Sequence, residues 1–307
     1  MTTDIEAPSV ARQATDRRGP LAPAKPRPLK ALLVRLFEHT WGAKLAGVIA
    51  DMRFALFRWR YPDASYADFY ARTIAARLMR GGSHKTLGAR KWGSGPLWGT
   101  APDHTETSHG VRGLRQFKWF LGRGLRRDMV CVDYGCGSLR VGQHFIRYLD
   151  TGCYHGVDMV ERFYRDGQKL IGADVIADKA PHFAVIEAAA LVALRQVGPD
   201  LVYSTAVLQH VPPKEILAFF SSIVSMMGIK TVAAVNFHSA DKMTRIGANS
   251  WAHTEESVLN AIAAVDSGMT LRIERWMGVS PNVMVLLCRD ADTLARWQAS
   301  DGGVDSH

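Results

Sequence analysis

The chain has 307 residues, of which 47% are hydrophobic and 22% are charged, as is ordinary for a soluble globular protein. This length suits one large domain or two modest ones, and no uncharged apolar run approaches the roughly 20 residues that a membrane-spanning helix requires. The four cysteines form no CxxC pair and show no metal-ligand spacing, so we expect no metal site and a reduced, cytoplasmic compartment.

The net charge of +9 is distributed unevenly along the chain. Residues 1–127 hold 23 Lys and Arg against 9 Asp and Glu, a net charge of +14, whereas residues 128–307 have a net charge of −5. A basic segment joined to a mildly acidic domain suggests an anionic partner, such as an anionic substrate, a membrane surface or a nucleic acid. A basic face that only keeps the protein soluble is an equally good interpretation.

The N-terminal third of the chain differs in composition from the rest. Residues 1–29 are rich in Pro, Ala and Arg and are predicted to be a disordered basic leader. Residues 30–108 are expected to form a helical extension that ends in a loop. Up to about residue 60 this extension is apolar and basic, which predicts one or two helices that pack on the main domain or lie on a membrane surface. Ser65 and Asp68 have the spacing of a capping box, which begins another helix.

Predicted strands and helices alternate from residue 129 onward. Because a helix separates each pair among the first six strands, parallel strands with helices on both faces are expected. The last two strands are separated only by GVSP, and so short a link requires antiparallel neighbours. We therefore predict an α/β fold over residues 109–292, with a mainly parallel seven-stranded sheet, a C-terminal antiparallel hairpin and a tail at 293–307. The predicted strands are residues 130–134, 153–157, 182–187, 200–207, 230–238, 269–277 and 282–290.

Two glycines, Gly135 and Gly137, stand where the first predicted strand turns into a helix. In an open α/β sheet, the ligand binds outside the carboxyl ends of the strands, beside the first strand. Asp158 ends the neighbouring predicted strand, where its carboxylate can accept hydrogen bonds from both hydroxyls of a ribose. The arrangement therefore predicts a ligand that contains a nucleoside, without saying which one.

Two residues beside these glycines bear on the choice of cofactor. A dinucleotide would require the pattern G-x-G-x-x-G, so that its pyrophosphate can approach a helix N-terminus. Arg140 occupies the third glycine position and is too bulky for that approach, and Asp133 would repel a pyrophosphate. The acid suits a cofactor with positive charge and no phosphate, such as S-adenosylmethionine. A nicotinamide-dependent oxidoreductase remains an alternative.

These features together resemble the class I S-adenosylmethionine-dependent methyltransferases. The resemblance rests on VDYGCGSLRVG, the acid in YHGVDM, the segment DLVYSTAVLQHV and the terminal hairpin, and it covers roughly residues 110–290. It implies a Rossmann-like methyltransferase fold, S-adenosyl-L-methionine as the cofactor, and Asp133, Gly135 and Gly137 at its methionine end. Leu139 departs from the family pattern D-x-G-x-G-x-G, which has glycine at this last position. The other residues that the resemblance implies are Asp158 at the ribose, Met159 and Glu187 at the adenine, and Ser204 from the fourth strand.

Methyl transfer from a sulfonium is an in-line displacement, which depends on positioning and requires no nucleophilic residue from the protein. An oxygen acceptor needs a base, and an amine has to be held neutral. His210 and His238 follow the fourth strand and end the fifth, and are the candidate catalytic residues, although His210 could instead order its loop. Residues 238–253 are expected to shape the pocket of an unidentified acceptor. A non-catalytic, methyltransferase-like binding module is a further alternative.

Overall fold

The computed structural model describes residues 41–82, 84, 86–87, 109–247, 249–276 and 281–297. The predicted basic leader, the first residues of the extension, most of its loop and residues 298–307 of the predicted tail lie outside these ranges. Apart from Trp41 and Gly42, the described residues belong to one compact unit, residues 43–307. The boundaries placed at 109 and 292 stay a prediction.

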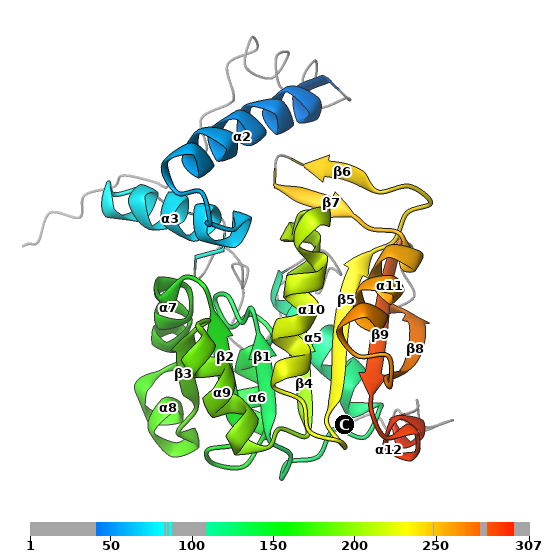
Figure 1. Cartoon of the computed structure of the whole chain (residues 1–307). Coiled ribbons are helices and arrows are strands. Elements are labelled where there is room, and N and C mark those ends of the chain that lie inside the picture. Colours follow the sequence, from blue (N-terminus) through cyan, green and yellow to red (C-terminus); the bar gives the residue numbers. More distant parts are fainter. Residues whose placement is uncertain are drawn as a thin grey trace, which may run out of the picture. The chain divides into compact units, whose positions relative to one another are not determined.

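Seven strands form one sheet in the order β3-β2-β1-β4-β5-β9-β8 (Figure 1). Strands β1 to β5 pair in parallel, whereas β9 is antiparallel to both β5 and β8. The predicted α/β fold, a mainly parallel seven-stranded sheet closed by an antiparallel hairpin, is therefore confirmed. The strands are β1 (Cys131–Tyr134), β2 (Tyr154–Asp158), β3 (His182–Val185), β4 (Leu201–Ser204), β5 (Val232–His238), β8 (Thr270–Arg275) and β9 (Asn282–Cys288).

Helices cover both faces of this sheet, as the alternation predicts (Figure 1). One hydrophobic cluster joins the sheet to α5 (His109–Leu121), α6 (Gly142–Tyr148), α7 (Glu161–Ile171), α8 (Ala173–Lys179) and α12 (Ala291–Arg296). A second cluster joins the other face to α9 (Ala188–Val197), α10 (Ile216–Ser225) and α11 (Glu255–Val265). Alternate residues of a strand point to opposite faces, so an apolar run such as β9 contributes side chains to both clusters.

The extension contains the two helices α2 (Trp41–Arg60) and α3 (Tyr66–Met79). The predicted capping box is confirmed: the Ser65 hydroxyl accepts the Asp68 N–H at 3.0 Å, and the Asp68 carboxylate accepts the Ser65 N–H at 2.8 Å. No helix within the described ranges combines the length and the apolar composition needed to cross a membrane.

The segment after β5 contains a small hairpin that the sequence analysis did not predict. Its strands, β6 (Thr244–Gly247) and β7 (Ser250–Ala252), form a separate two-stranded sheet. Trp251 of this hairpin packs edge-on against Tyr66 of α3, with ring centroids 5.3 Å apart. The hairpin therefore joins the extension to the main sheet.

Candidate functional site

The loop after β1 has the backbone geometry that its glycines predict. Gly135 and Gly137 have φ angles of +82° and +54°, in the left-handed region that side chains disfavour. The N–H groups of Gly135 and Cys136 both donate to the Val157 carbonyl of β2, at 2.8 and 3.0 Å, which holds the loop against the next strand. A Cβ atom at Gly135 would lie 2.3 Å from Cγ2 of Val207. Position 135 therefore needs glycine for two separate reasons.

Leu139, where the family pattern has its last glycine, also has a left-handed backbone, with φ of +62°. A branched side chain in this conformation costs roughly 1–2 kcal/mol. The leucine side chain is fully buried in the hydrophobic cluster that includes α5 and α6, and this burial offsets the strain. The loop thus keeps the backbone conformation of a glycine while using the side chain to anchor itself in the core.

Asp158, at the end of β2, uses both carboxylate oxygens to fix the loop. Its Oδ2 accepts the Gly137 N–H at 2.9 Å, and its Oδ1 accepts the Val160 N–H at 3.0 Å. Each carboxylate oxygen has a second acceptor site, so these two bonds leave capacity for hydroxyl donors from a ligand. Asp158 is buried, and it lines the pocket described below.

Asp133, in β1, is held by two tyrosines from the neighbouring strands. Its Oδ2 accepts the Tyr154 hydroxyl of β2 at 2.8 Å and the Tyr203 hydroxyl of β4 at 2.9 Å. Gly142 makes room for this contact, because a Cβ atom there would lie 2.2 Å from the Tyr154 hydroxyl. All three polar side chains are buried, so the network fixes the position of the Asp133 carboxylate.

Burial raises the pKa of both carboxyl groups. The pKa of Asp133 rises to about 7, against the lowering effect of the two tyrosine hydroxyls. The pKa of Asp158 rises to about 6, against the lowering effect of the backbone N–H donors from Val160 and Gly137. Since each shift comes from removing a charge from water, a cation bound beside these groups would favour their ionised forms.

The raised pKa of Asp133 predicts how the stability of the free protein depends on pH. The unfolded carboxyl group titrates near pH 3.9, so between about pH 5 and pH 7 the folded state binds a proton that the unfolded chain has lost. Stability contributed by this group therefore falls as the pH rises. Replacing Asp133→Asn removes the titration, and we expect the variant to gain ~2 kcal/mol relative to the wild type between pH 5 and pH 8.

Urea unfolding of both proteins at each pH measures this difference. The comparison of the variant with the wild type is needed because buried histidines change the stability with pH in the opposite direction. Burial lowers the pKa of His144 and His155 to about 4. Their contribution rises with pH and is common to both proteins. A stability difference that stays constant from pH 5 to pH 8 would contradict the assignment of a raised pKa to Asp133.

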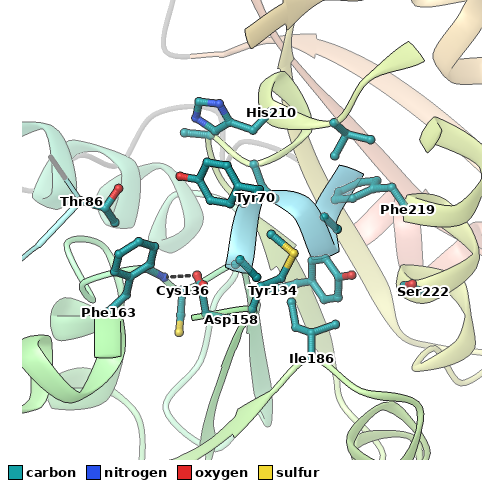
Figure 2. A pocket seen from close by; sticks show the side chains of 18 of the residues that line it. Tyr70, Thr86, Tyr134, Cys136, Asp158, Phe163, Ile186, His210, Phe219 and Ser222 are labelled. Carbon is teal, nitrogen blue, oxygen red and sulfur yellow. Dashed lines mark hydrogen bonds between the residues drawn. The ribbon is translucent and has the colours of Figure 1, made fainter. Parts of the chain in front are cut away.

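The glycine loop and the two carboxylates open onto a pocket of about 650 Å³. Its walls come from the carboxyl ends of β1 to β4, from α10 and, unexpectedly, from α3 of the extension. In Figure 2, Tyr70 and His210 lie on the upper side of this pocket, Asp158 and Ile186 lie on the lower side, and Phe219 lies on the side of α10. The pocket thus lies where the sheet topology predicts a ligand.

Most of the predicted site residues line this one pocket. The predicted residues that line it are Asp133, Gly135, Gly137, Asp158, Met159, Glu187 and His210. Ser204 lies behind the wall: its side chain is fully buried and its hydroxyl donates to the Tyr134 carbonyl at 2.9 Å. His238 is not among the lining residues either, and burial lowers its pKa. The structure therefore brings together seven of the nine predicted residues.

His210 has a defined set of partners at the rim of the pocket. Its Nδ1 lies 2.8 Å from the Asn249 carbonyl, which can only accept, so Nδ1 carries the proton. Its Nε2 lies 3.3 Å from the Gln209 amide nitrogen and is consequently the accepting nitrogen. No group of three or more His, Cys, Asp or Glu within the described ranges is arranged to hold a metal ion.

The contribution of α3 to the pocket was missed by the sequence analysis. Tyr70 projects toward the pocket from this helix, and burial raises its pKa well above the usual range. The first turn of α3 is fixed by a hydrogen bond in which the Tyr66 N–H donates to the Glu215 carboxylate at 2.6 Å. The capping box locates this helix in the sequence, but no local pattern indicates that it contacts a residue 149 positions away.

No protein-family profile and no curated protein matches the sequence. Solved structures do match. Magnesium protoporphyrin IX methyltransferase (ChlM) from Synechocystis PCC 6803, with bound SAH, is 17% identical with a TM-score of 0.49, covering 73% of this chain and 98% of that chain. The mitomycin 7-O-methyltransferase MmcR is 13% identical with a TM-score of 0.46, covering 74% of this chain and 69% of that chain. Fibrillarin from Aeropyrum pernix is 13% identical with a TM-score of 0.40, covering 56% and 76%.

Proposed function

We propose that the pocket binds S-adenosylmethionine and that the protein transfers the methyl group to an acceptor. The observation that carries this proposal is the pair of buried carboxylates, Asp133 and Asp158, beside a glycine loop in one pocket. Both have a raised pKa because of burial, so a ligand with positive charge gains from their ionisation. S-adenosylmethionine carries an ammonium and a sulfonium and no phosphate.

The charge of the pocket supports the same choice. Besides Asp133 and Asp158, three further carboxylates line the described part of the pocket: Asp68, Glu187 and Glu215. The same lining includes only one arginine, Arg140. A dinucleotide would bring two negative charges on its pyrophosphate into this acidic environment, where like charges repel. The charge balance therefore favours a cationic cofactor over a nicotinamide dinucleotide.

The proposed contacts follow the order of the strands. Asp158 would accept the ribose hydroxyls, and Met159, the next residue, would lie against the adenine. Glu187, exposed at the start of α9, would accept from the adenine amino group. Asp133 and the glycine loop would hold the methionine end, with Tyr154 and Tyr203 fixing the carboxylate. When bound, this cofactor supplies an activated methyl group.

The acceptor would occupy the part of the pocket between α3 and α10. Tyr70 of α3 and Phe219 of α10 offer ring surfaces there. His210 offers Nε2 as a base for an acceptor that loses a proton, provided that this acceptor displaces the Gln209 amide from Nε2. Because His210 lines the pocket and His238 does not, we favour His210 for this role. Ser204 would act indirectly, by fixing the backbone at the end of β1.

Titration calorimetry tests the choice of cofactor. We expect the protein to bind S-adenosylmethionine and not NAD, because the acidic lining repels a pyrophosphate and the bulk of Arg140 hinders its approach to the glycine loop. Binding at pH 7 should also release protons, since the cationic cofactor lowers the pKa of Asp133, and repeating the titration in buffers of different ionisation enthalpy measures this release. Binding of NAD without binding of S-adenosylmethionine would overturn the proposal.

Transfer of a tritiated methyl group into fractionated cell extract then tests catalysis. Labelled product in any fraction supports methyl transfer and identifies the acceptor class. Cofactor binding with no transfer into any fraction would favour the non-catalytic binding module. A His210→Asn variant should retain cofactor affinity while losing turnover if His210 acts as a base.

A further inference from the structure

Helix α2 is apolar on two opposite sides, and only one of them is covered by the described residues. On the inner side, Phe54 and Phe57 pack in a cluster with Tyr66, Phe69 and Trp251. The ring centroids of Phe54 and Tyr66 are 5.1 Å apart, and those of Phe57 and Phe69 are 5.4 Å apart. This inner side accounts for how α2 is attached to α3 and to the hairpin.

The outer side carries six large apolar residues at helical spacing, which we call the outer stripe. They recur every three or four positions, so they form one line along the helix, about 21 Å long at 1.5 Å per residue. Each of them is at least half exposed. The outer stripe consists of Leu45 (54% exposed), Val48 (53%), Ile49 (50%), Met52 (67%), Leu56 (69%) and Trp59 (81%).

The charges of α2 are predominantly positive. The helix contains Lys44, Arg53, Arg58 and Arg60 against a single acid, Asp51, whose carboxylate is paired with Arg245 at 2.6 Å. Arg53 and Arg60 are exposed and flank the outer stripe at helical spacing, and neither forms an ion pair with another described residue. An aliphatic line with arginines beside it and a tryptophan at one end matches the surface of an anionic bilayer.

Two other partners fit the outer stripe less well. A second copy of this chain would bring a second set of arginines against the first, and like charges oppose that contact. A nucleic acid would use the arginines but would stack on aromatic rings, whereas five of the six residues in the stripe are not aromatic. A lipid surface is the partner that uses the aliphatic residues and the arginines together.

We propose that the outer stripe of α2 binds the surface of membranes that contain anionic lipids, with the helix lying in the plane of the interface. This inference is independent of the proposed methyl transfer, because it requires neither cofactor nor turnover. The structural consequence is positional: α2 leads into α3, whose first turn lines the pocket. Binding through α2 would therefore hold the pocket near the lipid surface.

Co-sedimentation of the full-length protein with vesicles tests this proposal. Vesicles of phosphatidylcholine with phosphatidylglycerol should bind the wild type, and pure phosphatidylcholine vesicles should bind it more weakly. The double variant Met52→Asp/Leu56→Asp should bind the anionic vesicles at least about tenfold more weakly, since it places two carboxylates in the stripe. The variant Arg53→Glu/Arg60→Glu should lose roughly fivefold per arginine, and salt should weaken wild-type binding.

A matched control separates the stripe from general surface hydrophobicity. Val192 and Ile229 are 59% and 69% exposed and lie on α9 and after α10, outside α2. The double variant Val192→Asp/Ile229→Asp should bind vesicles as the wild type does, and circular dichroism should show that all the variants are folded.

Any of four results would overturn the proposal. The first is a wild type that does not bind anionic vesicles. The second is vesicle binding that the stripe variant retains in full. The third is a wild type that does not bind vesicles but forms a concentration-dependent dimer in analytical ultracentrifugation without lipid, together with a stripe variant that stays monomeric. The stripe would then be an interface between copies of the chain. Binding of single-stranded DNA by the wild type, in the absence of vesicle binding, would likewise assign the arginines to nucleic acid.

Discussion

The variant Gly135→Ala is expected to destabilise the fold by about 3 kcal/mol and to abolish measurable cofactor binding. Two costs add at this position. The backbone has φ of +82°, and the new methyl group would lie 2.3 Å from Cγ2 of Val207, a stiff branched side chain packed against the core. The loop would have to move away from Val207, which would disturb the hydrogen bond from the Gly137 N–H to the Asp158 carboxylate. Urea unfolding and calorimetry with S-adenosylmethionine measure the two effects.

Gly152→Ala provides a matched control for backbone strain alone. Gly152 has φ of +80°, almost the same as Gly135, but a Cβ atom there would meet no heavy atom within 4 Å. We expect this variant to lose only about 1–2 kcal/mol of stability and to keep its cofactor affinity. Equal losses of stability in the two variants would mean that the Val207 side chain can move aside at little cost and that the loop is not held in place.

The five inner strands of the sheet could be predicted because each is a short, buried β-type run bounded by turn residues. The edge strands β3 and β8 are only partly buried. The glycine loop and Asp158 were also accessible, since the carboxyl ends of adjacent parallel strands lie side by side in any such sheet. In both cases the constraint is local in sequence or follows from topology alone.

The Asp133 network could not be predicted in the same way, because it depends on strand register. Tyr203 lies directly opposite Asp133 in the pairing of β1 with β4, whereas Tyr154 lies opposite Cys131 in the pairing of β1 with β2. A shift of one residue in either pairing would point a tyrosine to the other face of the sheet. The left-handed backbone of Leu139 escaped prediction for a related reason, since only its burial in the core offsets the strain.

The position of α3 depends on contacts between distant parts of the chain. Its capping box and helical pattern are local, so the helix itself was predicted. Its place over the pocket is fixed by the Glu215 carboxylate and by the hydrogen bond from the Tyr66 hydroxyl to Asn249 at 2.7 Å, which join it to segments after β4 and between β6 and β7. The same long-range packing covers one apolar side of α2 and leaves the outer stripe exposed. The apolar composition of residues 30–60 alone could not show which side would be covered.

The variant Asp158→Ala is expected to weaken the affinity for S-adenosylmethionine by ~2 kcal/mol, about thirtyfold, or more. The proposed contacts are charge-assisted hydrogen bonds from the ribose hydroxyls to a carboxylate that is already oriented by the N–H groups of Gly137 and Val160. The truncation removes these contacts and also frees the Gly137 N–H, so the loop loses its anchor. Calorimetry at pH 7.5, on protein shown to be folded, measures the change in the dissociation constant.

Asp200→Ala is the control for losing a carboxylate that accepts from the backbone. Asp200 Oδ2 accepts the Val130 N–H at 2.9 Å at the opposite end of β1, so the variant should change stability and not cofactor affinity.

The pH dependence of cofactor binding gives a second, independent test of the role of Asp158. Because burial raises the pKa of Asp158 to about 6, lowering the pH through 6 protonates the carboxylate, and wild-type affinity should fall. The Asp158→Ala variant should lose that part of the decline, retaining only what the titration of Asp133 contributes. Unchanged affinity in folded Asp158→Ala would instead mean that the ribose binds elsewhere in the pocket, and the carboxylate at the end of β2 would then serve only to hold the glycine loop.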